Sequence, residues 1–183
     1  MLKRVLLTST TLLLMSGCVT KEIIYRPISS HAPRENNIEK IKSFENHNNL
    51  LNFSLNPNPK IGEFLNINAI PTIDGYLKII VINPNGERKL LIPNRFRGSR
   101  VKAGERFSSN NATFALKATR PVGIHHILVL FSQENPRVVI QQGMSSIYNA
   151  LEHDQDLYNL LKQIRDGEYG KSYISLFDIQ IDN

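Results

Sequence analysis

Two apolar runs bounded by turn residues constrain the fold of this chain most strongly. Tyr76 to Ile82 and Ile124 to Ser132 are nearly continuous in apolar residues, and each predicts a strand, the first a central one. Asn83-Pro84-Asn85-Gly86 follows the first run, with proline at a favoured turn position and glycine where a positive φ is needed. This turn predicts a hairpin between Tyr76–Ile82 and Lys89–Ile92, in which Gly86, like Gly75 before it, is a turn glycine.

Shorter patterns complete a mainly β domain. Phe64 to Ala69 alternates, Ala112 to Ala118 predicts another strand, and Tyr173 to Ile181 predicts a final strand that returns to the sheet. Before that last strand, one helix face that ends near Gly167 carries Ile147, Ala150, Leu151, Leu157, Leu160, Leu161 and Ile164. We predict a β-sandwich-like domain at residues 61–183 with one C-terminal α-helix. We expect that helix to pack on the domain rather than in a coiled coil or against a partner.

The segment before this domain has a different composition. Prolines and a high density of asparagine interrupt residues 18–60, and few apolar residues there offset the entropy of ordering. We therefore predict a flexible tether at 18–60. Ile38, Ile41 and Phe44 have the spacing of one helical turn and predict a short helix within it.

Residues 1–17 have the three parts of a secretion signal: the cations Lys3 and Arg4, an apolar stretch, and small residues before a cleavage point. The stretch has about 11 residues, whereas a membrane-spanning helix needs roughly 20. Leu14-Met15-Ser16-Gly17-Cys18 resembles the bacterial lipobox and ends in the only cysteine of the sequence. The resemblance implies cleavage before Cys18 and a lipid anchor there, with acyl chains such as palmitate. The alternative is an ordinary secretory peptide that carries a cysteine.

We expect the anchored protein to lie in the outer membrane. Val19 stands where an aspartate would be the usual signal for retention in the inner membrane, so we expect an anchor on the periplasmic side, with surface exposure left open. The formal charge of +6 falls to +4 when Lys3 and Arg4 leave with the leader. Such a balance suits lipid headgroups or peptidoglycan, while a periplasmic location argues against nucleic acid.

A longer set of motifs, in a fixed order, carries a resemblance to a known family. The segments are Ile61-Gly62-Glu63-Phe64-Leu65-Asn66-Ile67, Asp74-Gly75-Tyr76, Asn85-Gly86, Leu91-Ile92-Pro93-Asn94, Val101-Lys102-Ala103-Gly104 and Pro121-Val122-Gly123 with its following strand. They resemble the bacterial DUF4384 family from about Ile61 to Pro136, with Ile92 where phenylalanine is common. The resemblance implies an all-β, sandwich-like module that elsewhere is attached to kinases, caspase-like peptidases or lipid anchors. It brings no assigned catalytic residues.

Signatures of catalysis are weak. His125-His126 lies on a predicted strand, where adjacent side chains point to opposite faces, so the pair is a poor metal site. Gly143-Met144-Ser145-Ser146 lacks the nucleophile elbow, and there is no phosphate loop. We interpret the polar residues near the start of the predicted helix as a solvated helix face; they are Glu152, His153, Asp154 and Asp156. We expect no enzyme, no metal and no cofactor.

The most unusual local feature is a basic cluster after the hairpin. Arg88, Lys89, Arg95, Arg97, Arg100, Lys102 and Arg106 share the segment with one carboxylate inside the loop, Glu105. Arginine's planar fork suits phosphate and carboxylate. Candidate contacts to an anionic surface or partner are Arg95, Arg97, Arg100, Lys102 and Arg106. The alternative is a solvated loop whose charges point in several directions.

Together these features predict a lipid-anchored periplasmic protein that acts as a non-catalytic binding or scaffolding module. Its setting would be an envelope-spanning secretion or surface assembly, and its partner a protein or peptidoglycan. Two alternatives stay open: a lipoprotein of the type VI secretion membrane complex, and an envelope hydrolase, which would need convergent carboxylates or a nucleophile with its base.

Overall fold

The computed structural model describes residues 35–56, 58–111, 114–138, 140–141, 148–151 and 153–183. The helices in this part of the chain are α1 (Glu35–Lys42) and α2 (Asp154–Arg165). The strands are β1 (Leu51–Leu55), β2 (Ile67–Pro71), β3 (Gly75–Ile82), β4 (Arg88–Ile92), β5 (Arg100–Val101), β6 (Phe107–Ser108), β7 (Asn110–Asn111), β8 (Phe114–Ala115), β9 (Gly123–Ser132), β10 (Ile140–Gln141), β11 (Tyr148–Ala150) and β12 (Ser172–Ile181). The fold is mainly β, as predicted.

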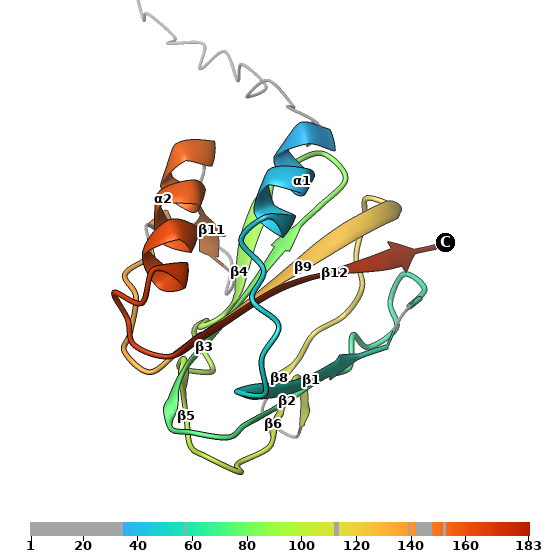
Figure 1. The fold of residues 1–183 in the computed structure, drawn as a ribbon. Coiled ribbons are helices and arrows are strands. Elements are labelled where there is room, and N and C mark those ends of the chain that lie inside the picture. The colour runs from blue at the N-terminus through green and yellow to red at the C-terminus, as the bar shows by residue number, and fades with distance from the viewer. Residues whose placement is uncertain (1–34, 57, 112–113, 139, 142–147, 152) are drawn as a thin grey trace, which may run out of the picture.

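The elements form three layers (Figure 1). The main sheet has the order β10-β11-β4-β3-β9-β12, with β5 paired to β3, and the small sheet has the order β1-β2-β6. A separate ribbon joins β7 to β8. One core lies between the two sheets, and a second lies between the main sheet and the two helices. The sandwich-like prediction is therefore confirmed, with a helical layer on its outer face.

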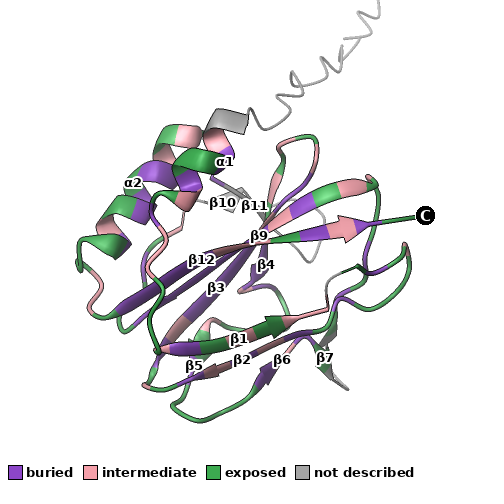
Figure 2. Ribbon diagram, turned by 45° about the vertical axis from the view of Figure 1, so that its right-hand side comes forward, coloured by how far each residue is buried: buried purple, intermediate pink, exposed green. Residues whose placement is uncertain are grey.

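The two long apolar runs are central because both faces of the main sheet are covered. In β9, Ile127, Val129 and Phe131 pack toward the small sheet, whereas Leu128 and Leu130 pack toward the helices. Side chains of a strand alternate between faces, so two buried faces require apolar residues at nearly every position. Figure 2 shows that most of β3 and the second half of β9 are buried, whereas β9 begins with exposed and half-buried positions.

The predicted hairpin is present, but its two glycines have different roles. β3 pairs with β4 across the turn, where Gly86 has a φ of 84° and the Asn83 side-chain oxygen accepts the backbone N–H groups of Asn85 and Glu87. Gly75 is not in the left-handed region, so the turn-glycine prediction is wrong there. A Cβ at Gly75 would lie 2.5 Å from the Ser132 carbonyl oxygen, so glycine is needed for close strand contact.

Three predicted boundaries differ from the structure. The strand predicted at Phe64–Ala69 corresponds to β2, which begins at Ile67 rather than Phe64, because the Leu65 N–H instead donates to the Leu116 carbonyl at 2.9 Å. The strand predicted at 112–118 is described only as β8, with Ala112 outside the described residues. The helix begins at Asp154, and Ala150 belongs to β11, which pairs with β10 and β4; Ile147 lies outside the described residues.

Part of the predicted tether is folded. Ile38, Ile41 and Phe44 pack into the helical core, which confirms the short helix, and β1 pairs along its whole length with β2. The described residues 35–56 and 58–60 therefore belong to the domain rather than to a tether, because their few apolar side chains are spaced to reach both cores. Cys18 and the rest of residues 1–34 lie outside the described residues. Neither helix in the described part is long and apolar enough to cross a membrane.

Candidate functional site

The basic loop, defined here as residues 93–106, follows β4 and is held in one conformation by Asn94. The buried Asn94 side chain accepts the backbone N–H groups of Phe96 at 2.8 Å and Arg97 at 2.9 Å, and donates to the Leu91 carbonyl at 2.7 Å. The backbone closes the same turn, since the Asn94 N–H donates to the Arg97 carbonyl at 2.9 Å. Asparagine side chains stabilise turns in this way.

The second half of the loop is fixed to the segment before β3. β5 pairs with the start of β3, and the Asp74 carboxylate accepts the Ala103 N–H at 2.9 Å. The Gly104 N–H donates to the Pro71 carbonyl at 2.8 Å. Gly104 has a φ of 73°, a conformation that favours glycine. The loop is thus tied to the sandwich at both ends.

The structure places most of the predicted cations at the surface of this loop. Arg95, Arg100, Lys102 and Arg106 are exposed. Arg97 is half-buried: its guanidinium lies 3.6 Å from the Glu105 carboxylate and 5.7 Å from the centre of the Phe107 ring. In Figure 1 the loop runs from β4 through β5 to β6 at the lower end of the molecule, away from the start of α1. Four cations remain available to a ligand.

Phe96 is the feature of this site that sequence reasoning missed. Its side chain lies between Arg95 and Arg97 in the chain and is 66% exposed. Asn94 bonds to its backbone, so the ring is presented from a fixed turn. The usable signal was the Arg-Phe-Arg triplet directly after a proline and an asparagine, because an aromatic residue at a turn has no strand or helix face to fill.

Arg88 and Lys89 do not share the surface of the loop. Arg88 lies on the helical side of the main sheet, its side chain only 8% exposed, where it forms an ion pair with Asp154 and donates to the Leu151 carbonyl at 2.6 Å. Asp154 also accepts from the Asn37 amide at 2.8 Å. Asp154, although its side chain is 44% exposed, is therefore also a structural link between α2, β4 and α1. Lys89 lies 3.8 Å from Glu87.

The paired histidines have separate environments. His125 is buried, with Nε2 2.8 Å from the Pro121 carbonyl oxygen, whereas His126 Nδ1 lies 2.6 Å from the Asp178 carboxylate. Burial lowers the pKa of His125, and its hydrogen bond with Pro121 opposes that shift. The described ranges hold no group of three or more His, Cys, Asp or Glu that could bind a metal ion. Glu152 and residues 143–146 lie outside them.

Comparison with known proteins matches one segment of the chain, which includes the basic loop, to a family model. Searches of curated proteins and of solved structures found no match. Residues 59–135 match the family model described as Domain of unknown function (DUF4384). The match runs from the segment before β2 to the end of β9, and leaves α1, β1, α2 and β12 outside. Residues 59–135 of this chain are therefore similar to a DUF4384 domain, and the basic loop lies in the middle of the matched segment.

Proposed function

We propose that this protein is an outer-membrane lipoprotein, anchored through Cys18, whose β domain serves as a non-catalytic binding or scaffolding module in the periplasm. The ligand would be an acidic surface or partner that contacts the basic loop. The lipobox-like segment and the single cysteine support the anchor. The exposed cations of a fixed loop support the binding role.

One observation carries the binding role: the loop combines exposed cations with an exposed aromatic ring on a backbone that is already ordered. Arginine forks pair with phosphates and carboxylates in two-point contacts. A side chain such as Phe96, exposed at the centre of a charged surface, favours a ligand with an apolar part beside its acidic groups. A fixed loop loses little conformational entropy on binding.

The loop is tested by changing Arg95, Arg97 and Arg100 together to serine, in a chain made soluble by Cys18→Ala. We expect the free energy of unfolding to change by less than about 1 kcal/mol, because Arg95 and Arg100 are exposed and the ion pair of Arg97 with Glu105 lies at the surface, where such pairs contribute little to stability. Co-sedimentation with purified peptidoglycan, with anionic liposomes or with both should weaken, and should weaken with salt, since screening shortens from about 30 Å at 0.01 M to about 8 Å at physiological salt.

The matched control changes Lys60, Arg120 and Arg137 to serine, which removes the same charge from exposed positions outside the loop. Equal losses in the two triple variants would mean that net charge, not the loop, drives binding. Phe96→Ser alone should weaken binding without changing its salt dependence. Binding that ignores salt and every substitution would exclude the loop.

The anchor is tested separately by Cys18→Ala in the natural host. We expect the protein to leave the membrane fraction and to lose labelling by fatty-acid probes, because acyl chains bury about 0.8 kcal/mol per methylene in the bilayer. A variant that stays in the membrane and is labelled equally would contradict lipidation at Cys18.

A further inference from the structure

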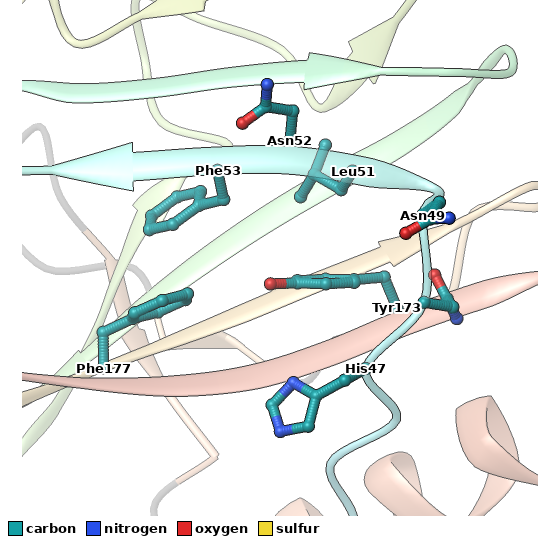
Figure 3. Close-up of a pocket in the computed structure, with 8 residues that line it drawn as sticks. His47, Asn49, Leu51, Asn52, Phe53, Tyr173 and Phe177 are labelled. Atoms are coloured by element: carbon teal, nitrogen blue, oxygen red, sulfur yellow. The ribbon is translucent and has the colours of Figure 1, made fainter.

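A groove separates the edge of the small sheet from the edge of the main sheet, far from the basic loop in the chain. Its walls come from β1 and β12 and from the segment that precedes β1, and its volume is about 560 Å³. Figure 3 shows Phe53 and Leu51 on one side, Tyr173 and Phe177 on the other, and His47 and Asn49 at one end. Sites for small ligands commonly measure about 300 to 1,000 Å³.

Aromatic rings form much of the groove. The rings of Phe53 and Phe177 meet across the two sheets with centroids 4.7 Å apart and planes tilted by 30°. The Tyr173 ring lies along the gap, and its hydroxyl points toward the two phenylalanines (Figure 3). The groove therefore offers flat apolar faces on a rigid base.

The Tyr173 hydroxyl is a polar group without a protein partner. Tyr173 as a whole is only 7% exposed, and within the described part of the chain its hydroxyl makes no hydrogen bond. The hydroxyl itself reaches solvent in the groove, unlike the buried unpaired hydroxyl of Tyr158. A solvent-accessible hydroxyl without a protein partner can both donate to and accept from a ligand.

The nearby amides divide into two groups. Asn46 and Asn48 are used within the fold: the Asn46 side chain accepts the Ile174 N–H at 2.5 Å, and the Asn48 amide donates to the Ser172 carbonyl at 2.6 Å. Asn49 and Asn52 are exposed groove residues whose side chains have no partner among the described residues. An amide both donates and accepts, as a hydroxyl does.

The charge of the groove narrows the ligand further. Its described lining contains no Asp, Glu, Lys or Arg, and His47 at one end has its Nε2 3.9 Å from the Glu45 carboxylate. The backbone at the outer edge of β12 already has hydrogen-bond partners, which disfavours a peptide ligand that would add to this edge as a further strand. Glu45 accepts the Leu176 N–H at 2.6 Å, and the Asn46 N–H donates to the Ile174 carbonyl at 3.1 Å.

We propose that this groove binds a neutral oligosaccharide. Each pyranose ring has an apolar C–H face that can lie against the half-buried rings of Phe53 and Phe177. Its hydroxyl or acetamido groups can pair with the Tyr173 hydroxyl and the Asn49 amide. This inference rests on the groove alone and does not depend on the basic loop or on the anchor.

The test uses the full chain and two probes, tri-N-acetylchitotriose and maltotriose, with saturation-transfer NMR to detect contact and a titration to measure Kd. We expect at least one probe to bind with a Kd of about 1 mM or tighter. Tyr173→Phe, which keeps the ring and removes the hydroxyl, should weaken that binding by about fivefold. Tyr76→Phe, the same change on β3 outside the groove, should leave it unchanged.

Asn49→Ala provides a second variant at an exposed position, should Tyr173→Phe affect folding. It should weaken binding by about threefold. Failure of both probes to bind at about 10 mM would overturn the proposal. So would binding that neither variant weakens, or saturable binding of a short extended peptide in their place. Loss of liposome or peptidoglycan binding in the arginine variants would leave this proposal untouched.

Discussion

The main sheet meets two different neighbours, and the contrast explains where the molecule is rigid. Toward the small sheet it presents side chains such as Ile79, Val129 and Phe131, which meet Ile67 and Phe107 in an apolar core. Toward the helices it also buries cations: Lys78 is 3% exposed and Arg88 pairs with Asp154. In the described residues on this side, Arg88 Nε and the Tyr158 hydroxyl are buried without partners.

This difference matters because buried polar groups cost free energy unless they are paired. The apolar side is the better scaffold, and both surfaces that we propose for binding lie at its edges. On the helical side, segments distant in sequence are linked through Asn37, Arg88 and Asp154. The buried polar groups of these links make this side less stabilising than the apolar side.

The strongest test of the apolar side is Gly75→Val. A Cβ there would lie 2.5 Å from the Ser132 carbonyl oxygen and 2.6 Å from the Phe131 ring, so β3 and β9 would have to separate. We expect a loss of about 3 to 5 kcal/mol in the free energy of unfolding, measured by urea titration. Gly98→Val is the control, because a Cβ there meets nothing within 4 Å. Equal stability of the two variants would mean that β3 and β9 are not in close contact.

A smaller effect is expected on the helical side from Ile41→Ala. Ile41 is fully buried between α1, α2 and the main sheet, although it lies in the segment predicted to be a tether. Removing its side chain should cost about 2 to 4 kcal/mol. Ile124→Ala, the same change at an exposed position of β9, should cost well under 1 kcal/mol. If the variant were as stable as the unmodified protein, residues 35–44 would be part of a flexible tether, as the sequence predicted, and not of the folded domain.

The smallest effect, and the one with a pH signature, comes from Lys78→Met. Burial lowers the pKa of Lys78 to about 8 from 10.5, although its ammonium donates to the Asn135 side chain at 2.7 Å. Below pH 8 the lysine is charged in both states, and folding carries the full cost of burying that charge. We therefore expect Lys78→Met to raise the free energy of unfolding by about 1 to 2 kcal/mol at pH 7.

Between pH 8 and 10.5 the folded protein releases this proton while the unfolded chain still holds it, so stability rises with pH and the advantage of methionine shrinks. Denaturant titrations of both proteins from pH 7 to pH 10.5 measure this convergence. A constant difference across that range would show that Lys78 does not titrate as its burial requires.

Patterns within short segments predicted which strands form the main sheet, but they predicted poorly where each element begins and ends. The runs of β3 and β9, the Asn83–Gly86 turn and the alternation of β12 each report a local periodicity, and each is present. β11 was hidden because Ala150 and Leu151 also fit the helical spacing that continues into α2. β1 was hidden in an asparagine-rich segment whose average composition resembles a linker.

The candidate sites were harder to predict, for a spatial reason. The charges of the basic loop are visible in the sequence. That Arg88 lies on the helical face of the main sheet, away from the loop, depends on strand alternation and on its ion pair with Asp154, 66 residues away. The groove joins Phe53 to Phe177, and neither residue is unusual in its own strand. Tertiary pairing creates that site, and no local pattern contains it.

The link between Asn46 and Ile174 has a consequence for when the fold can form. These residues exchange hydrogen bonds across 128 positions, and β12 completes the main sheet by pairing with β9 along ten residues. Such distant closures make folding slow, because a long loop must close before its contacts stabilise anything. The main sheet is therefore complete only when β12, at the far end of the chain from Asn46, has paired with β9.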